Sequence, residues 1–179
     1  MKVLVLGIGN VMFSDEGVGV HFVKMIEKNY KFTHQTDSLE FVDGGTLAIA
    51  LTPIIAGCDY LIVVDCISAE DSSIGDVYFF DYEAMPNQIS WDGSAHEVEM
   101  LQTLQLMDLA GDMPKTKILG VVPKRIEPMS FELSSEIQAS ASVMEKTLLN
   151  HLKELGFSYE KVANFTIINL ADEYKNKGI

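Results

Sequence analysis

The first twenty residues, MKVLVLGIGNVMFSDEGVGV (1–20), decide the fold class. Residues 3–6 form a short apolar run rich in β-branched side chains, which is typical of a buried strand. The glycine-containing segment 7–10 predicts a tight turn, and Ser-Asp-Glu at 14–16 combines a helix cap with acids in the first turn. A strand, a glycine turn and a helix open an α/β domain whose site lies at the carboxyl edge of its sheet.

The same loop partly matches the dinucleotide-binding pattern G-x-G-x-x-G. Gly7 and Gly9 fit, but Met12 stands in the third glycine position. Asp15 and Glu16 then open the helix, where two carboxylates would repel a pyrophosphate. We therefore reject nucleotide binding at this loop. Two interpretations of the acids remain: Glu16 is a functional carboxylate at the mouth of the sheet, or both acids only complement the helix dipole.

Composition limits the class of protein. A chain of 179 residues with 47% hydrophobic and 22% charged residues suits one globular domain with a proper core. A formal net charge of −13 argues against nucleic acid as a partner and favours a solvated acidic surface or a basic partner. We find no apolar run of membrane-spanning length, no signal peptide and no disulfide framework in two cysteines. These features predict a reduced, cytoplasmic protein.

Apolar periodicity predicts a β-α-β-α-β order, and hence a parallel sheet with right-handed crossovers. We expect helices over 15–29, 46–55, 94–109 and 134–155 and strands over 3–6, 39–42, 60–64 and 117–122, with a further edge or antiparallel strand over 76–82. The segment 31–37 reads as a polar connection. Residues 165–170 fit an extra edge strand, and the polar stretch 171–179 fits a flexible tail.

Three acids follow the first three predicted strands: Glu16, Asp43 and Asp65. In a doubly wound sheet such positions converge on one crevice. Asp65 directly follows an apolar run, where a carboxylate is costly to bury unless it is paired or bound to a cation; a cap or turn role is the alternative. Asp43 with Gly44 and Gly45 is ordinary turn chemistry, although glycines also let a peptide approach the backbone closely.

Among the four histidines, His96 is the candidate for chemistry because it opens a helix after a loop, where an imidazole can face a cleft. Packing or surface roles suffice for His21, His34 and His151. Glu16, Asp65 and His96 together would suit a borderline divalent metal such as Zn²⁺ or Ni²⁺, with positions left open for water or substrate.

Two rival motifs fail. The segment 96–100 begins like the zinc-protease pattern H-E-x-x-H, but Met100 replaces the second histidine. Cys66 lacks a nucleophile-elbow pattern, so a small buried hydrophobe is its expected role.

Several short motifs resemble one family. They are G-x-G-N at 7–10, D-E-G-x-G at 15–19, D-G-G-T at 43–46, Asp65 at a strand end and S-x-H at 94–96. In this order and spacing they resemble the nickel–iron hydrogenase maturation proteases. G-V-V-P at 120–123 and E-L-S-S-E-I-Q at 132–138 are similar to that family's closing strand and helix. The resemblance covers 1–156 as a single domain and leaves 157–179 as a C-terminal extension.

The resemblance implies a three-layer α/β/α sandwich around a mostly parallel twisted sheet. It also implies an aspartyl-type endopeptidase that removes a C-terminal extension from the hydrogenase large-subunit precursor after nickel insertion. The family's metal-contacting positions map onto Glu16, Asp65 and His96, and its turn near the substrate maps onto Asp43, Gly44 and Gly45.

We expect nickel to be carried by the substrate rather than held tightly by this chain, with zinc or cadmium able to occupy the site in vitro. The expected partner is the large-subunit precursor, with no nucleic acid, no membrane and a monomeric state. Three alternative functions remain for this sequence: a non-catalytic nickel-binding chaperone, a nucleotide-type α/β enzyme and another peptidase of this fold.

Overall fold

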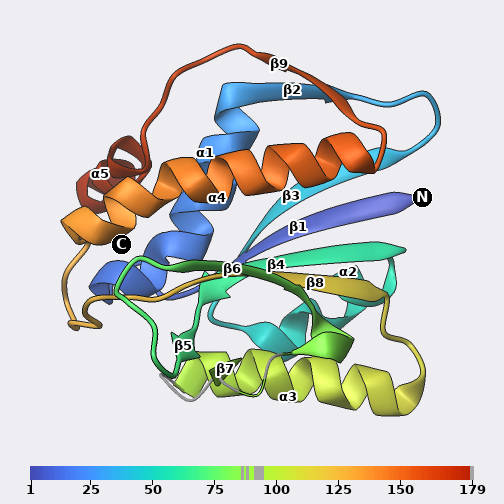
Figure 1. The fold of residues 1–179 in the computed structure, drawn as a ribbon, viewed down its shortest axis with the longest axis horizontal. Coiled ribbons are helices and arrows are strands. Elements are labelled where there is room, and N and C mark those ends of the chain that lie inside the picture. Colours follow the sequence, from blue (N-terminus) through green and yellow to red (C-terminus); the bar gives the residue numbers. More distant parts are fainter. Residues whose placement is uncertain (86, 88, 91–94, 178–179) are drawn as a thin grey trace.

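Figure 1 shows the fold in a computed structural model that describes residues 1–85, 87, 89–90 and 95–177, with the side chains of 90 and 95–99 left out of the description. The main sheet has the strand order β3–β1–β4–β8–β6. Its strands are β1 (Lys2–Ile8), β3 (Ser38–Gly45), β4 (Tyr60–Cys66), β6 (Val77–Asp81) and β8 (Lys115–Val121). Neighbouring pairs are parallel except β6 with β8, which confirms the expected antiparallel edge strand.

Helices cover both faces of the sheet, so the three-layer α/β/α architecture is confirmed (Figure 1). One face carries α1 (Val18–Asn29), α4 (Ser135–Glu154) and α5 (Ile167–Lys177), and the other carries α2 (Thr52–Ala56) and α3 (Ala95–Ala110). Short 3-10 turns η1 (Ser14–Gly17), η2 (Ala48–Leu51) and η3 (Tyr82–Ala84) join these elements. None of the described helices is long and apolar enough to cross a bilayer.

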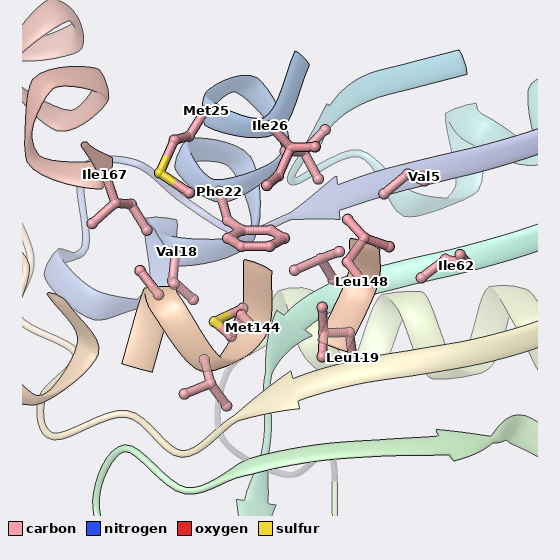
Figure 2. Packing of buried hydrophobic residues seen from close by; sticks show 14 of the residues in the cluster. Val5, Val18, Phe22, Met25, Ile26, Ile62, Leu119, Met144, Leu148 and Ile167 are labelled. Carbon is pink, nitrogen blue, oxygen red and sulfur yellow. The ribbon is translucent and has the colours of Figure 1, made fainter. Parts of the chain in front are cut away.

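The central strands are buried on both faces, as parallel strands between two helical layers must be. Every residue of β4 is buried, and its side chains alternate between two cores. Ile62 and Val64 face the α1/α4 core, whereas Leu61 and Val63 face the α2/α3 core. Figure 2 shows Phe22 of α1 and Met144 and Leu148 of α4 packed over Val5, Ile62 and Leu119 of the sheet.

The strand order reverses between β1 and β4. From β1 the chain passes through α1 on one face to β3, and from β4 it passes through α3 on the opposite face to β8. The carboxyl ends of β1 and β4 therefore flank the point at which an open α/β sheet forms its ligand crevice. The fold thus fixes where the functional residues have to lie.

The C-terminal segment differs from the sequence expectation. Residues 165–170 do not form an edge strand; α5 begins at Ile167 and continues to Lys177. The run F-T-I-I at 165–168 has local strand propensity, but Ile167, Leu170, Ala171 and Tyr174 form a buried helical stripe against α1, and this tertiary packing overrides the propensity. Helix α5 contributes to the same core as α1 and α4.

A second difference concerns the segment read as a polar connection. Residues Tyr30–Thr33 form β2, which pairs antiparallel with β9 (Ser158–Lys161). Tyr30, Phe32 and Tyr159 stack between the two strands at ring-centroid distances of 5.5–6.0 Å. The strand in the 157–179 extension is thus β9, which brings the extension beside the end of α1.

Candidate functional site

Glu16 lies in η1, in the turn that follows β1, and only 1% of the residue is exposed. Two glycines let this turn approach the sheet. At Gly9, with φ of +140°, a Cβ would stand 1.8 Å from the backbone oxygen of Glu16. At Gly19 a Cβ would stand 2.2 Å from the backbone oxygen of Val64 on β4. The glycine pattern at 7–19 therefore seats the turn and α1 directly on the strand ends.

Asp65 is the last residue but one of the fully buried strand β4 and is itself 0% exposed. Its Oδ1 accepts a hydrogen bond from the backbone N–H of Cys66 at 2.8 Å. The Cys66 thiol in turn donates to the backbone oxygen of Asp15 at 3.2 Å. Because Glu16 directly follows Asp15 and Asp65 directly precedes Cys66, this bond places the backbone of the Glu16 turn beside the end of β4. Cys66 is buried, as expected for a small hydrophobe.

Glu16 carries an unusual feature for a buried carboxylate. Its Oε1 is buried and has no hydrogen-bond partner among the described residues. A buried charged oxygen without a partner costs free energy, so such atoms mark sites completed by a ligand or by a neighbouring group. A carboxylate oxygen in this state is a suitable ligand for a borderline divalent cation.

His96 lies in the first turn of α3, and its side chain is outside the described part of the structure. The backbone nevertheless carries it toward the crevice. Strand β5 (Ser68–Ala69) follows β4 and pairs with β7 (Ile89–Ser90), and the partners Ser68 and Ser90 lie three residues after Asp65 and six before His96. No metal-binding group of three or more His, Cys, Asp or Glu occurs among the described side chains. The set Glu16, Asp65 and His96 therefore remains a prediction.

Asp43, at the end of β3, does not present a free carboxylate. Its Oδ2 pairs with the ammonium of Lys24 at 2.7 Å and accepts a hydrogen bond from the Tyr174 hydroxyl at 2.7 Å. Its Oδ1 accepts from the backbone N–H of Gly45 at 3.1 Å. Partial burial by itself would raise the pKa of Asp43, but these hydrogen bonds hold it below the usual range. Sequence reasoning did not anticipate either side-chain partner.

The two glycines after Asp43 have different roles. A Cβ on Gly44 would lie 2.7–3.0 Å from the side chains of Ile8, Leu6 and Leu51, so Gly44 is required by core packing. Gly45 has φ of +52°, and a Cβ there would meet only the Asp43 carboxylate, at 4.0 Å. The backbone oxygen of Gly45 accepts from Gly9 N–H at 3.0 Å, so this turn lies beside the loop after β1.

Two buried polar residues have environments that the sequence does not reveal. Asp15 is 0% exposed and accepts three backbone hydrogen bonds from residues 124–134, whereas its place in the sequence indicates only a helix-dipole role. His21 is also 0% exposed, and neither ring nitrogen has a partner among the described residues. Burial lowers the pKa of His21 to about 4. No local pattern in the sequence reveals these environments, since the neighbours come from distant segments.

Comparison with known proteins identifies the family of the chain. The family model described as hydrogenase maturation protease matches residues 20–151. The chain is 46% identical over 155 residues to protein HydD of Wolinella succinogenes, covering 85% of this chain and 96% of that protein. It is 30% identical over 157 residues to the hydrogenase 2 maturation protease of Escherichia coli K12, covering 87% and 93%.

The fold comparison gives the same answer. The solved hydrogenase maturating endopeptidase HybD of Escherichia coli superimposes with a TM-score of 0.77 at 27% identity, covering 90% of this chain and 98% of that one. The family model alone spans well over half of the chain. The family description and the names of both Escherichia coli proteins denote a protease or endopeptidase. The chain therefore belongs to the hydrogenase maturation proteases and is an endopeptidase.

Proposed function

We propose that this endopeptidase removes the C-terminal extension of a nickel–iron hydrogenase large-subunit precursor after nickel has been inserted. Glu16, Asp65 and His96 recognise the nickel that the substrate carries. The observation that carries this proposal is the pair of buried carboxylates at the ends of β1 and β4, linked through the bond between Cys66 and Asp15, with Oε1 of Glu16 lacking a partner among the described residues.

The chemistry of the donor set supports recognition of an ion that arrives with the substrate. Two carboxylates and one imidazole fill only part of a coordination sphere, which leaves positions for ligands from the substrate. Binding to such an ion would hold the precursor with its scissile peptide at the crevice. Water is the nucleophile, and the two carboxylates are the groups suited to accept its proton. This is an aspartyl-type peptide hydrolysis.

We place the peptide chain of the substrate along the turn that follows β3. Lys24 and Tyr174 already occupy the Asp43 carboxylate, and Gly44 fills a core position. Contact with the substrate therefore falls to the half-buried Gly45, by close approach of the two backbones, because its N–H already binds Asp43 and its carbonyl accepts from Gly9. Both cysteines are free thiols, which is in keeping with a reducing compartment such as the cytoplasm.

Site variants test the proposal. Wild-type protein, Glu16→Gln and His96→Ala are incubated separately with nickel-loaded precursor, and intact masses are recorded. Both variants should leave the precursor uncut while keeping the wild-type circular dichroism spectrum. Retained cleavage by His96→Ala would exclude His96 from the mechanism. Retained cleavage by Glu16→Gln would exclude the Glu16 carboxylate from it.

A further inference from the structure

The carboxylate of Asp15 links the turn that carries Glu16 to a loop more than one hundred residues away. Oδ2 accepts hydrogen bonds from the backbone N–H groups of Lys124 at 3.0 Å and Arg125 at 3.2 Å. Oδ1 accepts one from the backbone N–H of Ser134 at 2.7 Å. A fully buried carboxylate that receives three N–H donors is well satisfied, and each bond to a charged acceptor is stronger than a neutral one.

Other contacts between the same two segments are consistent with a single unit. Ser14 N–H donates to the backbone oxygen of Ser130 at 2.7 Å, and Ser130 N–H donates to Met12 at 3.0 Å. Phe13 and Ser130 form an isolated parallel bridge. Ser14 has φ of +53°, an unfavourable conformation for a residue with a side chain, and these bonds hold it there. Residues 12–16 and 124–134 form what we call the clamp.

The clamp also reaches the end of β4. The backbone oxygen of Asp15 accepts the Cys66 thiol, and Cys66 N–H donates to Asp65. Asp15 is thus bonded through its side chain to the loop and through its backbone to the residue beside Asp65. Its carboxylate is fully engaged by the loop, so any catalytic effect has to act through the neighbouring Glu16.

We propose that Asp15 is the positioning residue of this endopeptidase, because its buried carboxylate clamps the Glu16 turn to the 124–134 loop. This inference rests on the proposed function of Glu16. Displacement of a catalytic group by about 1 Å is enough to lower a rate about 100-fold. Without the clamp, the strained turn at Ser14 is free to relax and Glu16 moves away from Asp65.

Asp15→Asn is the direct test. An amide keeps the size of the side chain but replaces one acceptor oxygen with an N–H₂ group, which then faces a backbone donor. At least one of the amides of Lys124, Arg125 and Ser134 should exchange with deuterium about tenfold faster, as expected for the loss of roughly one hydrogen bond. The kcat on nickel-loaded precursor should fall about 100-fold, with little change in the Kd for that precursor.

A matched pair at Ser134 separates the clamp from general stability. The Ser134 hydroxyl caps α4 by accepting from Ile137 N–H, whereas its backbone N–H binds Asp15. Ser134→Ala loses only the cap. Ser134→Pro loses the cap and the N–H, and the native φ of −61° already suits proline. Ser134→Pro should lower kcat and weaken the protection of the loop amides from hydrogen exchange, whereas Ser134→Ala should change neither. This pair tests the role of the clamp even where Asp15→Asn folds poorly.

Three results would overturn the inference: full kcat in Asp15→Asn, equal losses in the two Ser134 variants, or a rise in Kd with unchanged kcat. Failure of the proposed function looks different, since wild-type protein would then leave the nickel-loaded precursor uncut. In that case the catalytic part of the inference falls with it. Hydrogen exchange at Lys124, Arg125 and Ser134 in Asp15→Asn still decides whether the clamp exists.

Discussion

The hydroxyl of Tyr174 in α5 donates a hydrogen bond to Oδ2 of Asp43 at the end of β3, over a distance of 2.7 Å. Lys24 of α1 contacts both residues: it pairs with Asp43, donates to the Tyr174 hydroxyl and lies 4.6 Å from the centre of the Tyr174 ring. The last helix is therefore fastened to the turn beside the candidate site. This contact connects the C-terminal extension to the functional edge of the sheet.

Removal of the Tyr174 hydroxyl should loosen this attachment. Tyr174→Phe keeps the ring against His21, at a centroid distance of 5.3 Å, and loses the bonds to Asp43 and Lys24. We expect a loss of about 1–2 kcal/mol in the free energy of unfolding and faster amide exchange in α5. Glu173→Gln is the control, since Glu173 forms with Lys28 an exposed ion pair that contributes only about 0–1 kcal/mol to stability. Equal effects of the two variants in urea titrations would count against the Tyr174 contact.

Gly19→Ala should be severely destabilising. The added Cβ would stand 2.2 Å and 2.3 Å from the backbone oxygens of Val64 and Ile8, and neither backbone can move without displacing a central strand. We expect a loss of more than about 3 kcal/mol, or no folded protein at all. Gly57→Ala is the matched control, because its φ is −85° and the nearest atoms lie 3.4 Å away. Its melting temperature should stay within a few degrees of wild type, and a stable Gly19→Ala protein would contradict the close approach of α1 to the sheet.

His21 should make stability fall in mild acid. Burial lowers its pKa from 6.5 to about 4, with Asp43 acting to raise the value and Lys24 to lower it further. As pH falls below 6.5 the unfolded chain takes up a proton that the folded chain excludes. The free energy of unfolding linked to neutral His21 is therefore fully present above pH 6.5. It is lost as pH falls toward 4, by up to about 3 kcal/mol.

Replacement of His21 by leucine isolates this effect from the titration of carboxylates. His21→Leu should lose less unfolding free energy than wild type between pH 7 and pH 4.5, as measured by urea titration at both values. Parallel losses in the two proteins would show that His21 takes up its proton in the folded state as readily as in the unfolded state.

The positions of Glu16 and Asp65 relative to the sheet could be predicted from local sequence alone. An unbroken apolar run before Asp65 identifies a central strand, and a glycine turn before Glu16 identifies the end of the first strand. Parallel strands have their carboxyl ends at one edge, so the topology places these acids at the same edge of the sheet. His96 followed from its place at a helix start, and its side chain remains a prediction.

The features missed by the sequence analysis depend on contacts between distant segments. Asp15 binds a loop 119 positions away, and Tyr174 binds Asp43 131 positions away. Neither pairing leaves a periodic signal in the chain. The β-branched run before Leu170 favours a strand locally, and only the apolar surface of α1 turns it into a helix. Long-range packing, rather than local propensity, decides these elements.

The most direct test of the central claim is the intact mass of a hydrogenase large-subunit precursor after incubation with this protein, with and without prior nickel loading. We predict that nickel-loaded precursor loses the mass of a short C-terminal peptide and that nickel-free precursor keeps its full mass. Equal cleavage of both forms would contradict recognition of substrate nickel at Glu16, Asp65 and His96. An unchanged mass of the loaded precursor in a stable complex would contradict the proposed cleavage itself.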